Sequence, residues 1–395
     1  MMEGWKTDKL GLLCKMYQPQ TIATSELNEN GRYLVYGANG IIGRYDKYNH
    51  EESQLLMTCR GNTCGEITVT KPFSWINGNA MVISPINHQI NIKYLEYYLK
   101  HISLEHIITG GAQPQITRTA LRLLKVSYPE SFSAQTAIAN ILSKVDEAIA
   151  SVQGSIAAAE RLKKSLMQNL LTGRMKPDGT LRKEDEFYMD EKFGKVPKGW
   201  EVKRIDEIAD FVQYGLNQAS SETGNIPMFR MNNIVNGEMQ NYPLVYMNLN
   251  ETALRQYKLE EGDILFNRTN SMDLVGKVGV FKLEGDFVFA SYLIRIRVSK
   301  DNNPYFVNYA LNSYPIQCSL RSKATPAVSQ ANINSKSLRV TSILIPTEKW
   351  EQDEIVSKIE QIELEINNKQ EKIATLERLK KSLMQNLLTG RVRVK

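Results

Sequence analysis

The sequence has few of the side chains that build metal centres. Its four histidines show no metal-ligand spacing, and its four cysteines form no CxxC pair: Cys14, Cys59, Cys64 and Cys318. The sequence therefore predicts no metal site, and the scattered cysteines are consistent with a reducing cytosol.

Long apolar runs are also missing. No segment reaches the roughly 20 apolar residues of a membrane-spanning helix, and the N-terminus lacks the charged and apolar regions of a signal peptide. These absences argue against a membrane partner and predict a cytoplasmic protein.

Three patterns resemble enzyme motifs, but each lacks a part that its chemistry needs. Residues 303–305 (NPY) lack the second proline and the Gly-rich cofactor loop of an amino-methyltransferase, so Pro304 is expected to open a helix. Residues 177–178 and 190–192 mimic the PD…DxK pattern of nucleases without the apolar strand that would hold the carboxylates. Residues 276–277 (GK) lack the upstream glycine of a phosphate loop. The sequence therefore predicts no catalytic residues, and its polar loop residues indicate binding instead.

The composition is sufficient for more than one domain. The 395 residues are 42% apolar, which suffices for sizeable cores in two globular parts joined to helices. The net charge of +6 permits nucleic-acid binding without demanding it.

The most informative feature is an internal repeat without a single change. Residues 160–174 and residues 377–391 both read ERLKKSLMQNLLTGR, 217 residues apart. This offset exceeds the period of solenoids and propeller blades, so it indicates two large half-molecules of similar design. The match continues upstream as far as Gln113 and Gln330, beyond which the halves diverge. Each half is thus predicted to be a variable globular part followed by a preserved helical part.

The preserved parts show a heptad pattern of apolar residues, which is typical of a helix that packs against a partner helix. The predicted seam positions are Ile138, Leu142, Val145, Ile149, Val152 and Ile156 in the first half and Ile355, Ile359, Ile362, Ile366, Ile373 and Leu376 in the second. The pattern then predicts a register slip, and the seam continues at Leu162, Leu166 and Leu170 in the first half and at Leu379, Leu383 and Leu387 in the second. A continuous helix over residues 135–171 would be about 55 Å long, and Gly173 and Gly390 are expected to end the two helices.

The simplest partner for each predicted helix is the other copy. We expect an antiparallel pair, because that arrangement places one globular part at each end and relates the halves by a pseudo-two-fold axis. A parallel pair would crowd both globular parts at one end. The alternative is that each long helix lies on its own globular domain.

These features predict an α+β fold in which two mixed α/β domains are separated by two long antiparallel coiled-coil helices. The predicted division is a first globular domain at 1–131, a first spacer helix at 132–174, a linker at 175–198, a second globular domain at 199–348 and a second spacer helix at 349–395. The linker is assigned to 175–198 because that segment is charged and contains proline and glycine.

Within the globular parts, short strands alternate with polar turns. Strands are predicted beside the turns at 37–40 and 60–63, at 262–266, 278–281 and 292–298, and directly before Pro129 and Pro346. Helices are predicted at 94–101 and 305–312.

Polar loops supply the candidates for binding. Arginine can form two hydrogen bonds to guanine, asparagine and glutamine can do the same with adenine, and lysine and small hydroxyls can hold phosphates. The candidate DNA-binding residues are Tyr36, Asn39, Arg44, Arg60, Asn62, Thr63, Gln113 and Gln115 in the first half and Arg230, Asn232, Asn233, Asn267, Arg268, Thr269, Asn270, Ser271, Tyr292, Arg321, Lys323, Ser329 and Gln330 in the second. The alternative is that these are ordinary turn residues, since Asn, Gly and Ser dominate turns.

The two halves also offer an alignment of these loops. Residues 59–63 and 267–271 each follow a predicted strand, and this alignment places Arg60 with Arg268 and Asn62 with Asn270.

This combination resembles the specificity subunit of a type I restriction-modification system. Members of that family carry two variable target-recognition domains, each followed by a preserved long helix, and here LMQNLLTGR ends both helices. The matching motifs are KVPKGW at 195–200, IPMFR at 226–230, GDILFNRTNS at 262–271 and SYLIR at 291–295, with YGANG at 36–40 and CRGNTC at 59–64 resembling a second recognition-domain subtype. The resemblance covers essentially the whole chain.

The resemblance implies a division of labour within a bacterial or archaeal complex. Each recognition domain would read one half of a bipartite double-stranded DNA target, and the helices would set the spacer. Two modification subunits would dock on the helices, bring S-adenosylmethionine and methylate one adenine in each half-site. Restriction subunits would add an ATP- and Mg-dependent translocase and nuclease, while this chain would hold no cofactor and carry no catalysis.

Two other functions fit the same residues. A specificity partner of a type II or phage-exclusion methyltransferase would look much the same, whereas a coiled-coil scaffold that binds only protein would not need the Arg/Asn loops. The first half departs from the family pattern because Gly4 and Trp5 follow almost no leader. That edge is expected to be either trimmed or completed by the C-terminal tail at 392–395.

Overall fold

A computed structural model describes residues 3–86, 89–326 and 330–394 of the chain. The described chain forms two compact units: unit 1 is Met1–Ser155 with Lys369–Lys395, and unit 2 is Ile156–Asn368. Two 39-residue helices, α4 Phe132–Leu170 and α10 Lys349–Leu387, contribute one end to each unit. Among the described residues, no helix combines the length and the apolar character that crossing a membrane requires.

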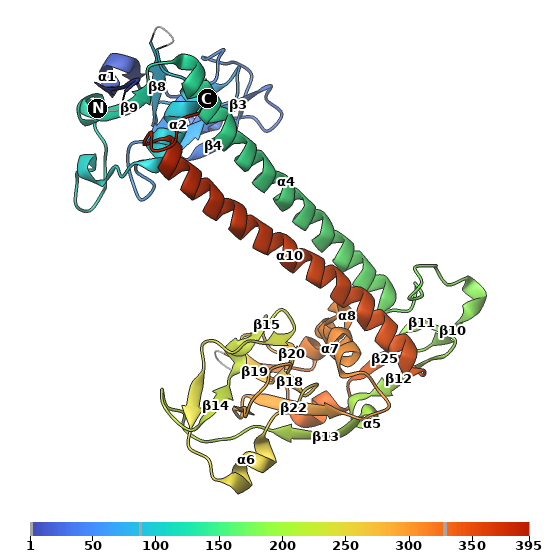
Figure 1. The fold of residues 1–395 in the computed structure, drawn as a ribbon. Helices are drawn as coiled ribbons and strands as arrows, with labels where there is room; N and C mark the ends of the chain where they lie inside the picture. Colours follow the sequence, from blue (N-terminus) through green and yellow to red (C-terminus); the bar gives the residue numbers. More distant parts are fainter. Residues whose placement is uncertain (1–2, 87–88, 327–329, 395) are drawn as a thin grey trace. The chain divides into compact units, whose positions relative to one another are not determined.

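Unit 1 is a mixed α/β body of short strands (Figure 1). Its elements before α4 are β1 Trp5–Lys9, α1 Leu10–Leu13, β2 Cys14–Tyr17, β3 Tyr33–Gly37, β4 Gly40–Tyr45, β5 Leu55–Thr58, β6 Ile67–Val69, β7 Trp75–Ile76, β8 Ala80–Pro85, α2 Ile92–His101, α3 Arg118–Leu123 and β9 Lys125–Pro129. The strands form three sheets, in the orders β1-β9, β2-β8-β5-β6 and β4-β3-β7. The apolar residues of β5, β8 and α2 share one core with the start of α4 and the end of α10.

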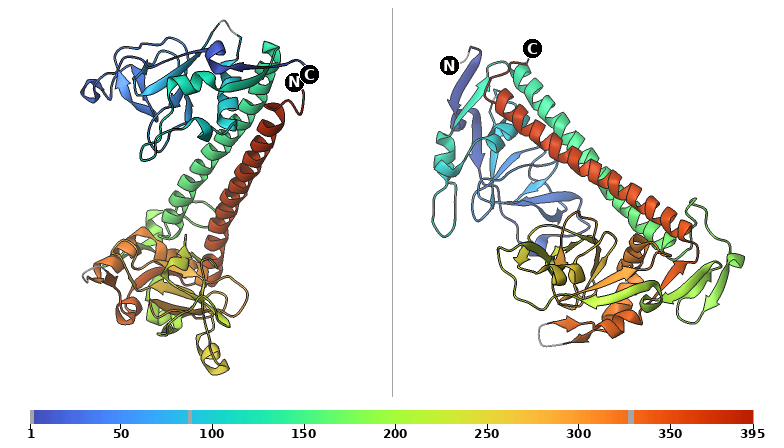
Figure 2. Two further views of the ribbon diagram at one scale, coloured as in Figure 1. Left: turned by 90° about the vertical axis from the view of Figure 1, so that its left-hand side faces the viewer. Right: turned by 60° about the horizontal axis from the view of Figure 1, so that its bottom comes forward.

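Unit 2 is larger and is built around a six-stranded sheet in the order β13-β22-β18-β20-β16-β15. Figure 2 shows the strands and helices of this unit from two further sides. Its strands are β10 Phe187–Asp190, β11 Gly194–Pro197, β12 Trp200–Arg204, β13 Ala209–Tyr214, β14 Ile226–Phe229, β15 Ile234–Val235, β16 Glu238–Met239, β17 Val245–Met247, β18 Ile264–Asn267, β19 Thr269–Asn270, β20 Val278–Val280, β21 Val288–Phe289, β22 Leu293–Val298, β23 Thr325–Pro326, β24 Ala331–Asn332 and β25 Ser342–Pro346. Its shorter helices are α5 Ile205–Ile208, α6 Glu251–Tyr257, α7 Pro304–Asn312, α8 Tyr314–Ser322 and α9 Ser335–Arg339.

The two units repeat one frame at the base of each long helix. In unit 1, β1 pairs antiparallel with β9 so that Trp5 lies opposite Pro129. In unit 2, β12 pairs antiparallel with β25 so that Trp200 lies opposite Pro346. In both units a closing strand therefore runs beside the strand that begins with a tryptophan and leads into the long helix.

A buried glutamine repeats a set of hydrogen bonds at the start of each long helix. Gln135 accepts the backbone N–H of Asn91 at 2.7 Å and donates to the last carbonyl of β9 at 2.9 Å. Gln352 accepts the backbone N–H of Asn303 at 2.7 Å and donates to the last carbonyl of β25 at 2.9 Å. Since Asn91 and Asn303 cap α2 and α7, each glutamine joins three elements. This shared role explains why the two glutamines align in the sequence.

The secondary structure predicted for the globular parts is confirmed at the main elements. The helices expected at 94–101 and 305–312 are α2 and α7, and the strands before Pro129 and Pro346 are β9 and β25. The strands expected at 262–266, 278–281 and 292–298 are β18, β20 and β22. The predicted turns at 37–40 and 60–63 separate β3 from β4 and follow β5.

The glycines after the long helices have the predicted left-handed backbone. The φ angles are 65° at Gly173 and 73° at Gly390. A Cβ on Gly173 would also lie 2.3 Å from the ring of Pro197. Both the left-handed backbone and the lack of space therefore favour glycine at position 173.

The segment predicted as a linker, 175–198, is folded onto unit 2, so the prediction of an independent linker is wrong. It contains the antiparallel hairpin of β10 and β11, and Val196 is fully buried. Arg182 forms an ion pair with Glu351 at the start of α10, and Glu351 also accepts the indole N–H of Trp200 at 3.1 Å. The high charge of the segment concealed these contacts, because most of its charged side chains are exposed while Arg182 is covered and paired with Glu351.

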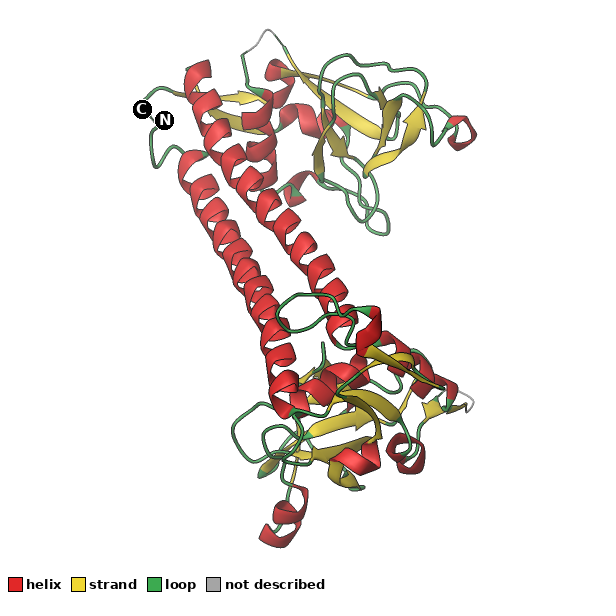
Figure 3. Ribbon diagram, turned by 90° about the vertical axis from the view of Figure 1, so that its right-hand side faces the viewer, coloured by secondary structure: helices red, strands yellow, loops and turns green. Residues whose placement is uncertain are grey.

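The ends of α4 and α10 pack against each other within each unit (Figure 3). In unit 1, Leu387 of α10 shares a core with Ile138 and Leu142 of α4. In unit 2, Leu170 of α4 shares a core with Ile355 of α10. The first part of one helix thus meets the last part of the other in both units.

The register slip predicted beyond Ile156 is wrong. Leu162 and Leu379 are 54% and 47% exposed, so they do not continue the seam. The later predicted leucines do pack in the two cores: Leu166, Leu170, Leu383 and Leu387. Lys163 and Lys380 take the next positions of an unbroken heptad series, with side chains only 28% and 26% exposed. A hydrophobicity pattern counts lysine as polar, although its aliphatic stem can cover apolar surface while the ammonium group meets an acid.

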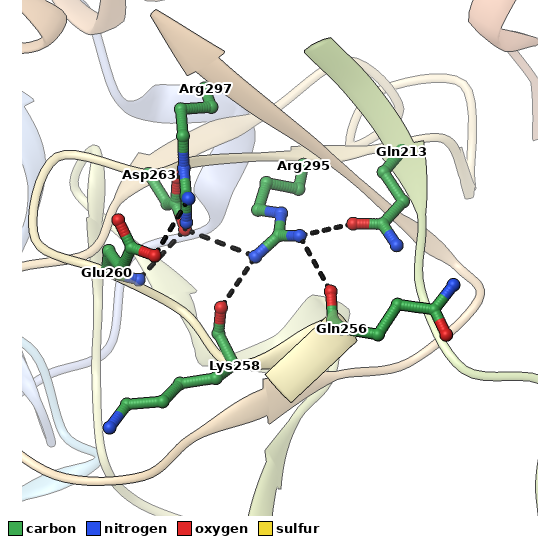
Figure 4. A network of polar contacts seen from close by, with 7 residues as sticks. All are labelled: Gln213, Gln256, Lys258, Glu260, Asp263, Arg295 and Arg297. Atoms are coloured by element: carbon green, nitrogen blue, oxygen red, sulfur yellow. Dashed lines mark hydrogen bonds and ion pairs between the residues drawn. The ribbon is translucent and has the colours of Figure 1, made fainter. Parts of the chain in front are cut away.

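A buried polar network joins several elements of unit 2 (Figure 4). Arg295 on β22 donates to the carbonyl of Gln256 at the end of α6, at 3.1 Å, and to the carbonyl of Lys258 just after α6, at 2.6 Å. Its guanidinium also donates to the side chain of Gln213 on β13 and lies 3.4 Å from the carboxylate of Asp263. One arginine therefore holds two neighbouring strands, the approach to β18 and the end of α6.

The two described ends of the chain meet in unit 1. Arg393 donates to the carbonyl of Glu3 at 3.3 Å, and Val394 packs against the core of the unit. The expectation that the C-terminal tail completes this edge agrees with these contacts.

Candidate nucleic-acid interface

In unit 1, three polar loops converge beside β5. The turn after β5 is fixed to the later loop by the hydrogen bond from Gly61 N to Pro114 O at 3.0 Å and by the backbone pairing of Arg60 with Gln115. Thr63 donates to the side chain of Asn39 at 2.6 Å, which brings in the turn between β3 and β4. Segments from three separate parts of the sequence therefore form one polar surface.

Most of the unit 1 candidates lie exposed on this surface. The exposed members are Asn39, Arg60, Asn62, Gln113 and Gln115, while Thr63 is half-buried. One guanidinium and four side-chain amides can thus meet a ligand together. These are the groups that hydrogen-bond to base edges in the major groove.

Two other candidates in unit 1 have a structural role, because their side chains bond to the backbone of the unit. Tyr36 is 4% exposed within an apolar cluster, and its hydroxyl accepts the backbone N–H of Lys71 at 3.1 Å. Arg44 donates to the carbonyls of Gly31 at 2.5 Å and Arg32 at 3.0 Å, which fixes the turn before β3. Tyr36 is too buried for DNA contact, and the guanidinium of Arg44 is already engaged by backbone carbonyls.

In unit 2, Arg268 lies at the centre of the corresponding surface. Its guanidinium stacks on the ring of Tyr214 at 4.9 Å and donates to Asn332 Oδ1 at 3.4 Å and to Ser291 O at 3.5 Å. Thr269 accepts from Asn332 Nδ2 at 2.7 Å, because β19 pairs with β24. The arginine is held in place by these neighbours and is half-buried.

Other unit 2 candidates surround Arg268 or lie exposed elsewhere in the unit. Asn270 pairs with Ala331 across the β19–β24 ladder, so the loop after β18 is joined to the segment before α9. The exposed candidates are Asn232, Ser271, Tyr292 and Gln330, while Thr269 and Asn270 are half-buried. Ser329 lies outside the described residues.

Two asparagines in unit 2 are buried, so their prediction as DNA contacts is wrong. Asn233 is fully buried and donates to the carbonyls of Gln240 at 3.0 Å and Pro243 at 2.9 Å. Asn267 is also fully buried and donates to Leu274 O at 3.3 Å. Both asparagines shape a turn, which is the alternative role that the sequence offers for this residue type.

Three basic candidates of unit 2 are partly covered. Arg230 and Arg321 are half-buried, and the Nε atom of each has no hydrogen-bond partner among the described residues. Lys323 donates to Thr341 Oγ1 at 3.2 Å. Burial, with a smaller contribution from the charge of Lys192, lowers the pKa of Lys323. These three side chains are less available than Arg60 for contact with a ligand.

The alignment of Arg60 with Arg268 is wrong by one residue. In unit 1, Ile116 N donates to Cys59 O at 2.9 Å, and in unit 2 the aligned Ile333 N donates to Arg268 O at 2.8 Å. Cys59 therefore takes the backbone position of Arg268, and Arg60 takes that of Thr269. The two guanidiniums leave the backbone at different places, so the two surfaces are not copies of each other.

Two residues beside Arg268 were absent from the sequence-based candidates. Tyr214, which is 41% exposed, forms the stacking surface, and Asn332 holds both Arg268 and Thr269. Asn332 lies two residues after the candidate Gln330, so the polar run there was a usable signal. Tyr214 ends a strand and carries no such signal.

The surfaces offer binding groups rather than a metal centre. In the part of the chain that the structure describes, no group of three or more His, Cys, Asp or Glu side chains is arranged to hold a metal ion. The side chains that do converge are neutral amides, hydroxyls and arginines, which suit recognition of DNA bases and phosphates.

Comparison with known proteins agrees with this chemistry. Residues 2–161 and 197–378 match the family model described as "Type I restriction modification DNA specificity domain". The chain is 25% identical to the type I restriction enzyme MjaVIII specificity subunit of Methanocaldococcus jannaschii, over 100% of this chain and 94% of that protein. It is 27% identical to the putative MjaX specificity subunit of the same organism, where the match spans 52% of this chain and half (50%) of that protein.

A solved structure shows a similar fold. The type I restriction-modification system S subunit from M. genitalium superposes with a TM-score of 0.61 at 14% identity, covering 97% of this chain and 96% of that chain. The two-domain layout is therefore shared with that protein.

Proposed function

The chain belongs to the type I restriction modification DNA specificity family, and from this premise we propose that each of its units reads one half of a bipartite DNA target. The observation that carries the proposal is the contrast between the units. Their frames repeat the same ladders and glutamine contacts, whereas their polar surfaces differ in residues and in backbone register. Two different half-sites need two different surfaces on one shared frame.

The long helices would act as the spacer between the half-sites. We propose that α4 and α10 form an antiparallel coiled coil with pseudo-two-fold symmetry. The pairing of opposite helix ends within each unit supports this arrangement. The heptad seam supports it as well, since Ile138, Leu142, Ile355 and Ile359 are buried.

The repeated segment supports docking of two copies of one partner. Six residues of α4 are exposed in the segment, and the six equivalent residues of α10 are also exposed: Glu160, Arg161, Leu162, Lys164, Ser165 and Gln168, and Glu377, Arg378, Leu379, Lys381, Ser382 and Gln385. The same side chains are thus presented twice, which is what two identical modification subunits would require. An exposed leucine in each stripe, Leu162 and Leu379, provides an apolar contact within a polar rim.

In this proposal the chemistry belongs to the partners. Modification subunits would supply S-adenosylmethionine and methylate one adenine per half-site, on opposite strands. Restriction subunits would add the ATP- and Mg-dependent nuclease. The chain described here would supply the sequence recognition and the assembly platform.

The test is to produce the chain with its modification subunits in cells and to sequence methylated adenines. The expected result is one asymmetric, bipartite motif with a fixed spacer and a methylated adenine in each half. Cells that produce the modification subunits without this chain serve as the control. Absence of a bipartite motif, together with no shift of DNA mobility by the purified complex, would contradict the proposal.

A further inference from the structure

A three-residue polar cluster lies where α4 and α10 meet in unit 1. Lys380 Nζ lies 2.6 Å from Asp146 Oδ1, and Tyr97 donates its hydroxyl to Asp146 Oδ2 at 2.7 Å. The ammonium group of Lys380 also lies 5.6 Å from the centre of the Tyr97 ring. Burial, with a further contribution from the charge of Asp146, raises the pKa of Tyr97, which keeps the hydroxyl protonated as a donor.

Unit 2 contains the same cluster. Lys163 Nζ lies 2.7 Å from Glu363 Oε1, and Tyr309 donates its hydroxyl to Glu363 Oε2 at 2.8 Å. Burial is again the main cause that raises the pKa of Tyr309, and the charge of Glu363 adds to it. Tyr309 lies on α7, which corresponds to the helix α2 that carries Tyr97.

The lysines and the acids of the two clusters are related by the offset of the sequence repeat. Lys163 and Lys380 are 217 residues apart, and so are Asp146 and Glu363. The lysine of each copy pairs with the acid of the other copy. The acid and tyrosine of one half therefore receive a lysine that arrives from the opposite half of the chain.

The lysines occupy seam positions where an apolar residue would give more stability. A polar group at a single seam position is tolerated when it specifies one register, at a cost in stability. Here the side chains of Lys163 and Lys380 are about three-quarters covered, at 28% and 26% exposed, so a mispaired register would leave each ammonium group partly desolvated without an acid.

Neighbouring registers offer no replacement for the acids. A slide by one heptad moves one helix about 10 Å along the other. The residues that would replace the two acids are Gln370 and Gln153 in one direction and Val356 and Ala139 in the other. In each case both lysines lose their carboxylate partners at once.

We propose that Lys163 and Lys380, each with its acid and tyrosine, are positioning residues that fix the register of α4 against α10. The consequence of this fixed register for the DNA spacer rests on the proposed function. A single register would give a single spacer length, so the clusters would set specificity without touching DNA.

The register can be trapped with engineered cysteine pairs in the full chain, without DNA. Ile149→Cys with Leu376→Cys reports the observed register, because these seam positions are opposite each other when Asp146 meets Lys380. Ile149→Cys with Leu383→Cys, or with Lys369→Cys, reports a slide by one heptad in either direction. Mass spectrometry of the linked peptides separates engineered links from the four natural cysteines.

The test variant is Lys163→Met/Lys380→Met, which keeps the length of the stem and removes the charge. In the unmodified background only the observed-register pair should link, and in the test variant the yield of a shifted pair should rise at least tenfold. The variant leaves Glu363 and Asp146 without their counter-charges, so it should melt at a lower temperature but stay folded, because these side chains are still 23% and 40% exposed to water. Leucine at the same two positions is the second variant, in case methionine packs poorly.

The matched control exchanges the charges within a cluster. Lys163→Glu with Glu363→Lys keeps an ion pair at the same place, so only the observed-register pair should link. If the methionine and leucine variants stay folded and still link only that pair, the register assignment is overturned.

A second arm measures methylated sites in cells. The methionine variant should give sites with more than one spacer length, whereas the unmodified chain gives one. If the shifted links appear while no bipartite methylation is found for either chain, the register lock stands and the proposed function fails. If the shifted links appear while the spacer stays single, the role of the clusters in specificity is overturned.

Discussion

Arg60 and Arg268 are the same residue type in two different settings. The side chain of Arg60 is exposed at the tip of a turn, while Arg268 stacks on Tyr214 and bonds to Asn332. Truncation of Arg268 would disturb its neighbours as well as any base contact. Arg60 is therefore the cleaner residue for a test of direct readout.

At the scale of the residue, we predict that Arg60→Ala weakens binding at the unit 1 half-site by about 1–3 kcal/mol, as expected for loss of a two-bond contact to guanine. The measurement is competition by DNA duplexes altered in one half-site, using the complex with modification subunits. Thermal stability should not change, because the side chain is exposed.

Arg32→Ala is the matched control for this prediction, since Arg32 is another exposed arginine of unit 1. It should leave the discrimination between half-sites unchanged. Equal weakening at both half-sites, or at neither, would show that Arg60 does not read a base.

At the scale of the element, the strands of unit 2 depend on one buried charge cluster. Asp263, 2% exposed, accepts from Arg297 Nη2 at 2.7 Å and lies 3.4 Å from Arg295 Nη1. Burial lowers the pKa of Arg295, whereas the hydrogen bond to Asp263 raises that of Arg297. The ring of Phe211 covers both guanidiniums, at 4.9 and 5.0 Å. The shared carboxylate therefore compensates two arginines in a largely apolar setting.

We predict that Asp263→Asn destabilises the chain by about 3–5 kcal/mol, because it leaves a buried arginine without its counter-charge. Denaturant unfolding of the full chain, followed by intrinsic fluorescence, measures the change. Glu260→Gln is the control. Glu260 pairs with the same Arg297 at 2.8 Å, but its side chain is 65% exposed, so the expected change is below about 1 kcal/mol. Similar losses in both variants would contradict the assigned role of burial.

The elements that the sequence predicted are those with a periodic or repeated signal. The long helices, α2, α7 and the closing strands β9 and β25 follow from heptads, local patterns and the internal alignment. The hairpin in 175–198 could not be predicted in this way, because it carries no periodic signal and its covered Arg182 pairs with Glu351, which lies far away in the sequence.

The candidate interface was only partly predictable for a related reason. Asparagine has the same propensity for turns whether it faces solvent or the core, so Asn232 and Asn233 could not be distinguished from the sequence. The structure separates them, since Asn233 is fully buried and Asn232 is exposed. Long-range pairing decides such cases, as it does for the one-residue offset between Arg60 and Arg268.

At the scale of the whole molecule, the two halves share the contacts that build the frame, whereas the residues of their polar surfaces differ. The strand ladders, the buried glutamines and the lysine–acid–tyrosine clusters recur in both units with the same partners. The polar loops recur only in location. A frame that is stabilised independently of its loops allows one surface to change without loss of the fold.

The spacer role makes a prediction for the whole chain. Insertion of one heptad into each long helix, after Val152 in α4 and before Ile373 in α10, keeps the seam in phase and leaves both lysine–acid clusters intact. Seven residues lengthen a helix by about 10 Å, which corresponds to about three base pairs of DNA. Methylated adenines in cells should therefore report the same two half-sites with a spacer longer by about three base pairs. An insertion in α4 alone puts the two helices out of register and should abolish methylation. An unchanged spacer in the double insertion, with both half-sites still methylated, would rule out the helices as the ruler.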